Sequence, residues 1–196
     1  MRWGLSVDLG WNFPAPAFVG GVEGHIGWQF SNLFAAYLIL GSHFGLGITA
    51  SVNGSNSAKG GITAFGAYYG GAIAEIMLAD LFYVGGGALL GSGGYAGLTV
   101  GVDAGSGSQQ VQALAQGGFM FGFDARLGLN FGRARPPTSW RRGGFNLGID
   151  VMTILRPNTT IVTETADASG NFGIGVTTTA LTASVMPMLT LGYDSR

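Results

Sequence analysis

The chain has 196 residues, a formal charge of −1 and 10% charged residues, against about 25% in ordinary soluble domains. This charge gives no basis for nucleic-acid binding, and the absence of cysteine excludes disulfides and thiolate sites. The mean hydropathy is +0.37, yet no run of about 18 apolar residues occurs, so we expect no transmembrane helix.

The first stretch, residues 2–12, alternates strictly between apolar and small or polar side chains. A period of two predicts a β-strand with one apolar face, which begins at Trp3 and ends at Trp11. Tryptophan favours membrane–water interfaces, and the two indoles would lie roughly 26 Å apart along a strand. The pattern is typical of a strand that crosses a membrane, with Asp8 on its inner face.

The same alternation recurs along the rest of the chain. The later predicted strands span residues 18–30, 34–52, 62–78, 82–102, 111–131, 145–165 and about 172–193. In the last of these, Ile174 and Val176 are out of phase with the outward set that ends at Tyr193. This phase change predicts a β-bulge around residues 177–179.

The connections between the predicted strands alternate in character. Those after the second and fourth strands are tight three-residue turns, whereas those after the first, third, fifth and seventh are longer and polar. Outer-membrane barrels have short periplasmic turns and longer extracellular loops, and an even strand number places both termini on the side of the short turns. The sequence therefore predicts one domain, residues 1–196, folded as an eight-stranded antiparallel up-and-down transmembrane β-barrel. Several strands exceed the roughly 9–11 residues needed to cross, so we expect the barrel to project on the loop side.

Large aromatic residues gather at one predicted rim, on every strand but one. Trp11 marks the opposite interface more loosely. The predicted interface aromatics are Trp3, Trp11, Trp28, Phe30, Phe34, Phe82, Phe131, Phe145 and Tyr193.

In this architecture the chain resembles the small eight-stranded outer-membrane barrels of the OmpA-transmembrane, OmpX and OmpW type. The resemblance covers the whole chain but contains no signature motif. Leu191-Gly192-Tyr193 is similar to the terminal hydrophobic-x-aromatic signal of such barrels, although three further residues follow it. The resemblance implies the outer membrane of a Gram-negative bacterium, with bilayer lipid and lipopolysaccharide as partners. Because Met1 leads directly into the first strand, we expect a mature sequence from which a signal peptide has been removed.

Nine charged or ionisable side chains fall on the predicted inner faces. They are Asp8, Glu23, His25, His43, Glu75, Asp103, Asp124, Arg126 and Asp150. We interpret them as a polar lumen network, acidic in balance, and the many inner glycines leave room for a cavity. If a pore exists, it should favour cations.

Other interpretations of these residues stay open. The predicted register makes Glu23 and His43 diagonal neighbours, which is an acid/base arrangement. Lipid A-modifying barrels use a histidine with a serine and an acid, but Ser42 and His43 point to opposite faces of one strand. The spacing of two histidines and a glutamate is too loose to predict a metal site, and we expect no cofactor.

The remaining exception is the long connection of residues 133–144, which contains two prolines and four arginines on the short-turn side. It is either a solvated turn or a contact for lipid phosphates or an acidic partner. We expect a non-enzymatic outer-membrane protein, either a structural barrel or a narrow channel for small solutes. The alternatives are a lipid-modifying enzyme, an adhesion barrel with partner-binding loops, and a soluble glycine-rich β-protein.

Overall fold

A computed structural model describes residues 1–14, 16–53, 57–79, 81–103, 108–135, 138–167 and 169–195. Nearly all of these residues form antiparallel β-strands. The strands are β1 (Arg2–Asn12), β2 (Ala17–Gln29), β3 (Phe34–Asn53), β4 (Ser57–Leu78), β5 (Phe82–Asp103), β6 (Ser108–Asn130), β7 (Arg133–Arg135), β8 (Thr138–Asp167) and β9 (Phe172–Ser195). The described residues contain no helix long and apolar enough to cross a membrane.

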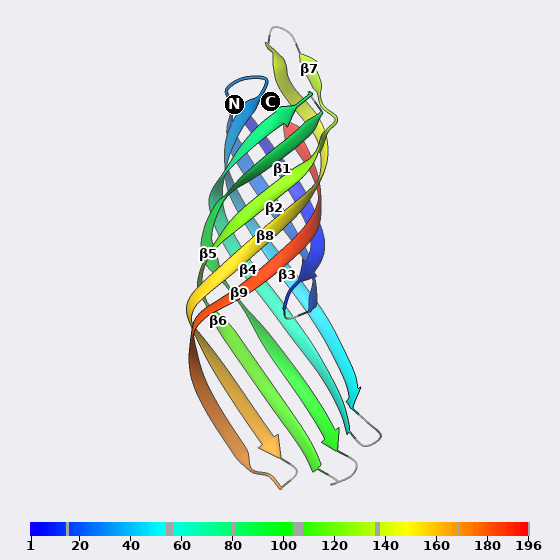
Figure 1. The fold of residues 1–196 in the computed structure, drawn as a ribbon, viewed down its shortest axis with the longest axis vertical. Helices are drawn as coiled ribbons and strands as arrows, with labels where there is room; N and C mark the ends of the chain where they lie inside the picture. Colours follow the sequence, from blue (N-terminus) through cyan, green and yellow to red (C-terminus); the bar gives the residue numbers. More distant parts are fainter. Residues whose placement is uncertain are drawn as a thin grey trace.

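The strands form one up-and-down sheet that closes on itself (Figure 1). From β1 to β6, and again from β7 to β9, neighbours in sequence pair with one another. β1 also pairs with β9, and the pairing of β6 with β8 completes the ring. The eight predicted long strands are therefore present in the predicted up-and-down order, and both termini lie at the end that carries the short turns.

One prediction about the strands is wrong. Residues 133–144 are not simply a connection, because β7 pairs with the start of β8 through Arg133↔Gly143 and Ala134↔Arg142. Backbone hydrogen bonding thus continues the β6–β8 hairpin past the ring, and β8 begins at Thr138 instead of near residue 145. The side chains of the Arg133–Arg142 turn lie outside the described residues.

The register between β2 and β3 agrees with the prediction from parity. Glu23 pairs with Gly41, and the turn between Phe30 and Phe34 has three residues. The Ser31 hydroxyl accepts hydrogen bonds from the Phe34 amide at 3.0 Å and from the Leu33 amide at 3.1 Å, which satisfies donors that the turn would otherwise expose.

The phase change predicted in the last strand has a different origin from the one expected. β9 keeps one register with β8 from Phe172 to Asp194, so no bulge separates these two strands at residues 177–179. The register shift lies between β6 and β8, where β8 has one more residue than β6 between Gly117 and Phe121. The set of residues that points outward therefore switches from odd to even numbers in both β8 and β9. Because both strands switch together, the register between them is unchanged.

Burial follows the period of two where the strands form the ring. In β1 every even residue from Arg2 to Asp8 is buried and every odd residue from Trp3 to Leu9 is exposed. The interior of the ring holds the polar network described below together with an apolar cluster, whereas the outer face is apolar. Among the most exposed large apolar side chains are Ile48, Phe172 and Ile174, at 84%, 85% and 74%.

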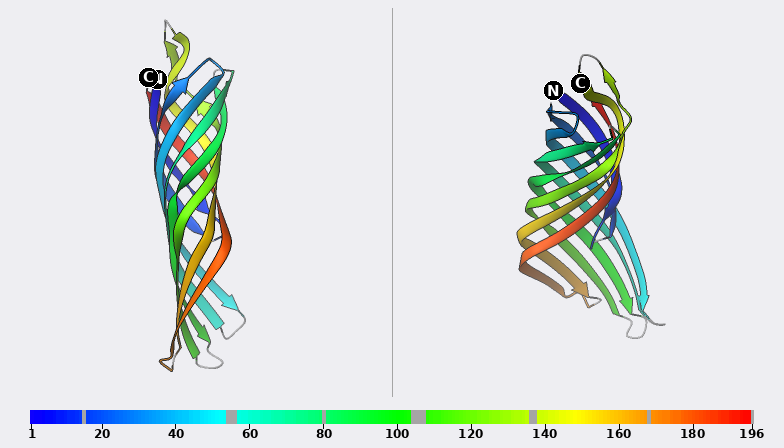
Figure 2. Two further views of the ribbon diagram at one scale, coloured as in Figure 1. Left: turned by 90° about the vertical axis from the view of Figure 1, so that its left-hand side faces the viewer. Right: turned by 45° about the horizontal axis from the view of Figure 1, so that its top comes forward.

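The strands differ greatly in length, and this divides the sheet into two parts (Figures 1 and 2). The β1–β2 hairpin ends about halfway along the molecule, and its last pair with β3 is Phe18↔Leu46. Beyond it, β3 continues to Asn53 paired with β4 only, and β9 from Phe172 to Ser184 pairs with β8 only. We call the part that contains β1 and β2 the closed ring. The distal sheet consists of residues 48–53, 57–65, 95–103, 108–117, 159–167 and 172–182.

Candidate functional site

The candidate site is the polar network that fills the closed ring. Its side chains come from inward positions on β1 to β4, β6, β8 and β9, which the two-residue period turns toward one another. No backbone or hydrophobic pattern specifies which of them meet. Closure of the ring does this by placing β6 opposite β2 and the two chain ends side by side.

Arg126 on β6 is the centre of the first cluster. Its Nη1 and Nη2 donate to the two carboxylate oxygens of Glu23 at 3.1 and 3.2 Å, and its Nε donates to Asp124 Oδ2 at 3.0 Å. A third acid, Asp150, lies 3.8 Å from Nη2. All four side chains are at least nine-tenths buried, so one guanidinium holds three carboxylates away from bulk solvent.

His43 belongs to the same level of the ring and, as predicted, lies diagonally from Glu23, but its hydrogen-bond partner is Asp8. Its Nε2 hydrogen-bonds Asp8 Oδ2 at 3.1 Å, while Glu23 accepts from the Tyr69 hydroxyl at 3.3 Å and from Arg126. The His43 ring stacks on Tyr69 with 5.3 Å between centroids. Among the described contacts, Glu23 and His43 therefore do not form an acid/base pair.

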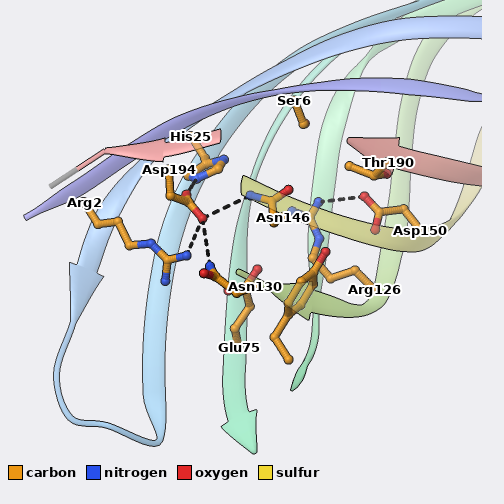
Figure 3. A pocket seen from close by; sticks show the side chains of 11 residues that line it. Arg2, Ser6, His25, Glu75, Arg126, Asn130, Asn146, Asp150, Thr190 and Asp194 are labelled. Atoms are coloured by element: carbon orange, nitrogen blue, oxygen red, sulfur yellow. Dashed lines mark hydrogen bonds and ion pairs between the residues drawn. The ribbon is translucent and has the colours of Figure 1, made fainter. Parts of the chain in front are cut away.

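A second cluster gathers on Asp194, close to the chain ends (Figure 3). Its carboxylate forms an ion pair with Arg2, binds His25 Nε2 at 2.5 Å and accepts from the side-chain amides of Asn146 and Asn130 at 3.1 and 3.3 Å. These partners come from four strands besides β9. Asp194 thereby ties the last strand to the first and closes the ring through side chains as well as backbone.

Glycine makes room for the rings of these clusters. A β-carbon on Gly21 would lie 2.0 Å from the His43 ring, and one on Gly41 would lie 2.4 Å from the Tyr69 hydroxyl. Gly4 lies under His25 in the same way, at 2.5 Å. At these three positions the space beside the glycine is filled by a neighbouring ring, so it adds nothing to a cavity.

The interior is closed at two levels. Toward the distal sheet, an apolar cluster that includes Leu89, Met120, Met152, Ile154 and Met186 packs across the ring. At the opposite end, the space between the two ionic clusters is a polar cavity of about 20 Å³. A cavity of this size holds about one water molecule, so side chains nearly fill the space between the two ionic clusters.

Most of the predicted lumen residues meet in these clusters. Glu75 lines the same cavity as Arg2 and Asp194 and is 8% exposed. Asp103 does not join them, because it lies at the far end of β5 in the distal sheet and is exposed.

The interior also holds three charged residues that were not predicted to lie there, Arg2, Arg156 and Asp194. Arg2 shares its parity with the predicted inner residue Asp8, and Arg156 shares its parity with Asp150. Asp194 has the parity opposite to the predicted outward set of its strand, so the alternation itself contained the signal. Arg156 Nη1 donates to Ser184 at 3.1 Å. Counting the described side chains, six buried acids now face three arginines and two histidines, a smaller acidic excess than predicted.

All nine predicted interface aromatics point outward and are between 41% and 63% exposed. Phe30 stacks on Phe34 and Phe145 contacts Tyr193 at the rim of short turns. A second belt of outward aromatic side chains includes Trp11, for which the sequence predicted few aromatic neighbours. It comprises Trp11, Phe18, Phe44, Tyr68 and Phe119, in which Trp11 contacts Phe18 and Phe44 contacts Tyr68.

Among the described residues, no three His, Asp or Glu side chains come together as a metal site would require. Neither the protein-family models nor the curated proteins contain a match to this chain. The residues and their geometry are therefore the basis for any proposal about its function.

Proposed function

We propose that this chain is an integral protein of the bacterial outer membrane, and that its closed ring is a transmembrane β-barrel plugged by its own side chains. Its role would be structural, without catalysis or solute passage. The proposed partners are the lipids of the bilayer and lipopolysaccharide.

The observation that carries this proposal is the inverted distribution of side chains. Charged residues such as Asp8 and Arg126 are buried, while Leu5, Val7 and Leu9 on the opposite face of the sheet are about half exposed. In water this arrangement would leave an apolar surface around the whole ring, far larger than the patches that soluble monomers expose. Hydrocarbon is the solvent that suits such a surface.

The two aromatic belts support the same proposal. Trp3 and Trp11 are eight residues apart in β1, or roughly 26 Å along the strand and some 20 Å vertically at a tilt of about 40°. Between the belts the long strands pair on both sides within the described residues, as a span through hydrocarbon requires. The exception is the register shift between β6 and β8 beside Phe119.

The packed interior favours a structural role over a channel. Met120 and Met186 are 1% and 0% exposed within the apolar cluster that blocks the passage. The two histidines are held by Asp194 and Asp8, and Ser42 faces away from His43. These contacts fit a rigid ionic plug better than a site that must admit a lipid.

Depth-dependent fluorescence quenching tests the proposal. Three single-tryptophan variants retain Trp3, retain Trp11 or place the only indole at Val7→Trp, midway between them in β1. Lipid brominated near the end of its acyl chains should quench the Val7→Trp variant most, and lipid brominated near the headgroup should quench the other two most. Equal quenching at all three positions, or a chain that stays dissolved without detergent and fails to float with vesicles, would refute the proposal.

A further inference from the structure

The distal sheet has two faces of opposite character, and the cross-strand pairs define them. One row runs Ile48↔Ile62↔Leu98↔Ala113↔Glu164↔Ile174, and the adjacent rows add more apolar residues on the same side. The opposite face is rich in threonine, glycine and glutamine, as in Thr49↔Gly61↔Thr99↔Gln112↔Thr165↔Gly173. Paired residues in antiparallel strands point to the same side, so the first face is apolar across six strands.

The edges of the distal sheet indicate where it lies. β3 from Ile48 to Asn53 and β9 from Phe172 to Ser184 each have a partner strand on one side only. Unpaired amides and carbonyls cannot sit in hydrocarbon, because nothing there satisfies them. If the closed ring is the membrane barrel proposed above, on which this inference rests, the distal sheet stands in water and its apolar face needs another cover.

That face carries a ridge and a hollow. The ridge is Phe172, Ile174 and Val176 on the edge strand β9, which are 85%, 74% and 67% exposed. The hollow, about 530 Å³, lies over β4, β5, β6 and β8. It is lined chiefly by small and aliphatic residues, including Ile62, Ala64, Ala96, Leu98, Ala115 and Val162.

From these features we propose that the apolar face of the distal sheet binds a second copy of this chain. In a two-fold pair, the ridge of each copy seats in the hollow of the other, so one self-complementary contact is made twice. Two barrels inserted in the same orientation can form this pair about an axis normal to the membrane. The face measures roughly 24 Å across five strand spacings and 23 Å along seven residues. The pair would then cover about 1,100 Å² in projection, which clears the roughly 1,000 Å² that a biological interface needs.

Because the chain has no cysteine, single-cysteine variants report this contact directly. Ile174→Cys on the ridge and Ala96→Cys in the hollow are mixed after refolding into nanodiscs or detergent and oxidised. The proposal predicts a disulfide-linked heterodimer. The matched control replaces Ala96→Cys with Thr99→Cys, on the polar face of the same strand, and should give no link above that of random collision.

A second pair of variants tests the energetics. Ile174→Lys should weaken self-association in sedimentation equilibrium by about tenfold or more, whereas Thr163→Lys, on the polar face of the β8–β9 hairpin, should leave it unchanged. Both variants should still float with vesicles, which measures insertion separately. A chain that inserts but stays monomeric, without the 174–96 link, overturns the dimer and leaves the proposed function intact.

Two further outcomes also count against the second copy. If the inserted chain is monomeric and lipopolysaccharide alone shields the Ile174→Cys thiol from maleimide, lipid covers the face instead. If the chain does not insert at all, the membrane proposal fails, and the dimer proposal that rests on it fails with it.

Discussion

Removing the guanidinium of Arg126 should be the most damaging single change inside the ring. Arg126→Met deletes the hydrogen bonds to Glu23 and Asp124 and the 3.8 Å ion pair with Asp150, leaving three buried carboxylates without their shared cation. Breaking a buried ion pair by removing one partner typically costs about 3–5 kcal/mol, because the other charge stays desolvated. We expect the free energy of unfolding to fall by at least that amount, since three acids lose the same partner.

Urea unfolding of the refolded chain in detergent micelles or vesicles, followed by tryptophan emission, measures this loss. Arg126→Lys keeps the charge but not the two-pronged contact with Glu23, so it should cost less, roughly 1–3 kcal/mol. Lys59→Met removes a charge from the exposed surface of the distal sheet and should change stability by no more than about 0.5 kcal/mol. If Arg126→Met were as stable as Lys59→Met, the network would not stabilise the ring and the reasoning would be refuted.

Three more predictions concern the packing and closure of the interior. Gly21→Ala should cost about 1–3 kcal/mol in the same assay, since its β-carbon would meet an imidazole ring at 2.0 Å. Gly24→Ala, with 3.9 Å to the nearest atom, should be tolerated, and equal effects would contradict the close packing. Asp194→Asn should lower stability by roughly 3 kcal/mol, whereas the exposed Asp103→Asn should be neutral; similar losses would show that the Asp194 cluster does not secure the ring. In planar bilayers the unsubstituted chain should conduct no steady current, and such a current would contradict the plug. Met120→Gly should open a path that favours small cations, because buried acids outnumber buried arginines inside the ring.

The closed ring fills its interior with an ionic network at one end and an apolar cluster toward the distal sheet. Arginine and carboxylate clusters fill one end, and the gaps beside them are closed by rings laid across glycines, such as His43 over Gly21. Such a network tolerates few alternatives, because any unmatched buried charge is expensive. Each inward position therefore requires a particular residue, while the outer face requires only apolar side chains.

The alternation of residue types determined much of this protein by itself. A strand has a period of two, so sequence parity alone assigns Trp3 and Leu5 outward and Asp8 inward, and it predicts the Glu23↔Gly41 register across a three-residue turn. The same parity would have placed Arg2 and Asp194 inside had it been applied to the strand ends.

Tertiary structure decided which inward residues meet. Arg2 and Asp194 are 192 positions apart in sequence and come together only because β1 pairs with β9. Glu23 binds Arg126 across the ring instead of His43, its neighbour on β3. Asp103 is exposed because the β1–β2 hairpin ends before β5 does. Whether a side chain points inward or outward is a local property of its strand. Which inward side chains contact one another depends on how all the strands are staggered when the ring closes. That stagger is the sum of every pairing in the sheet, and no single stretch of sequence contains it.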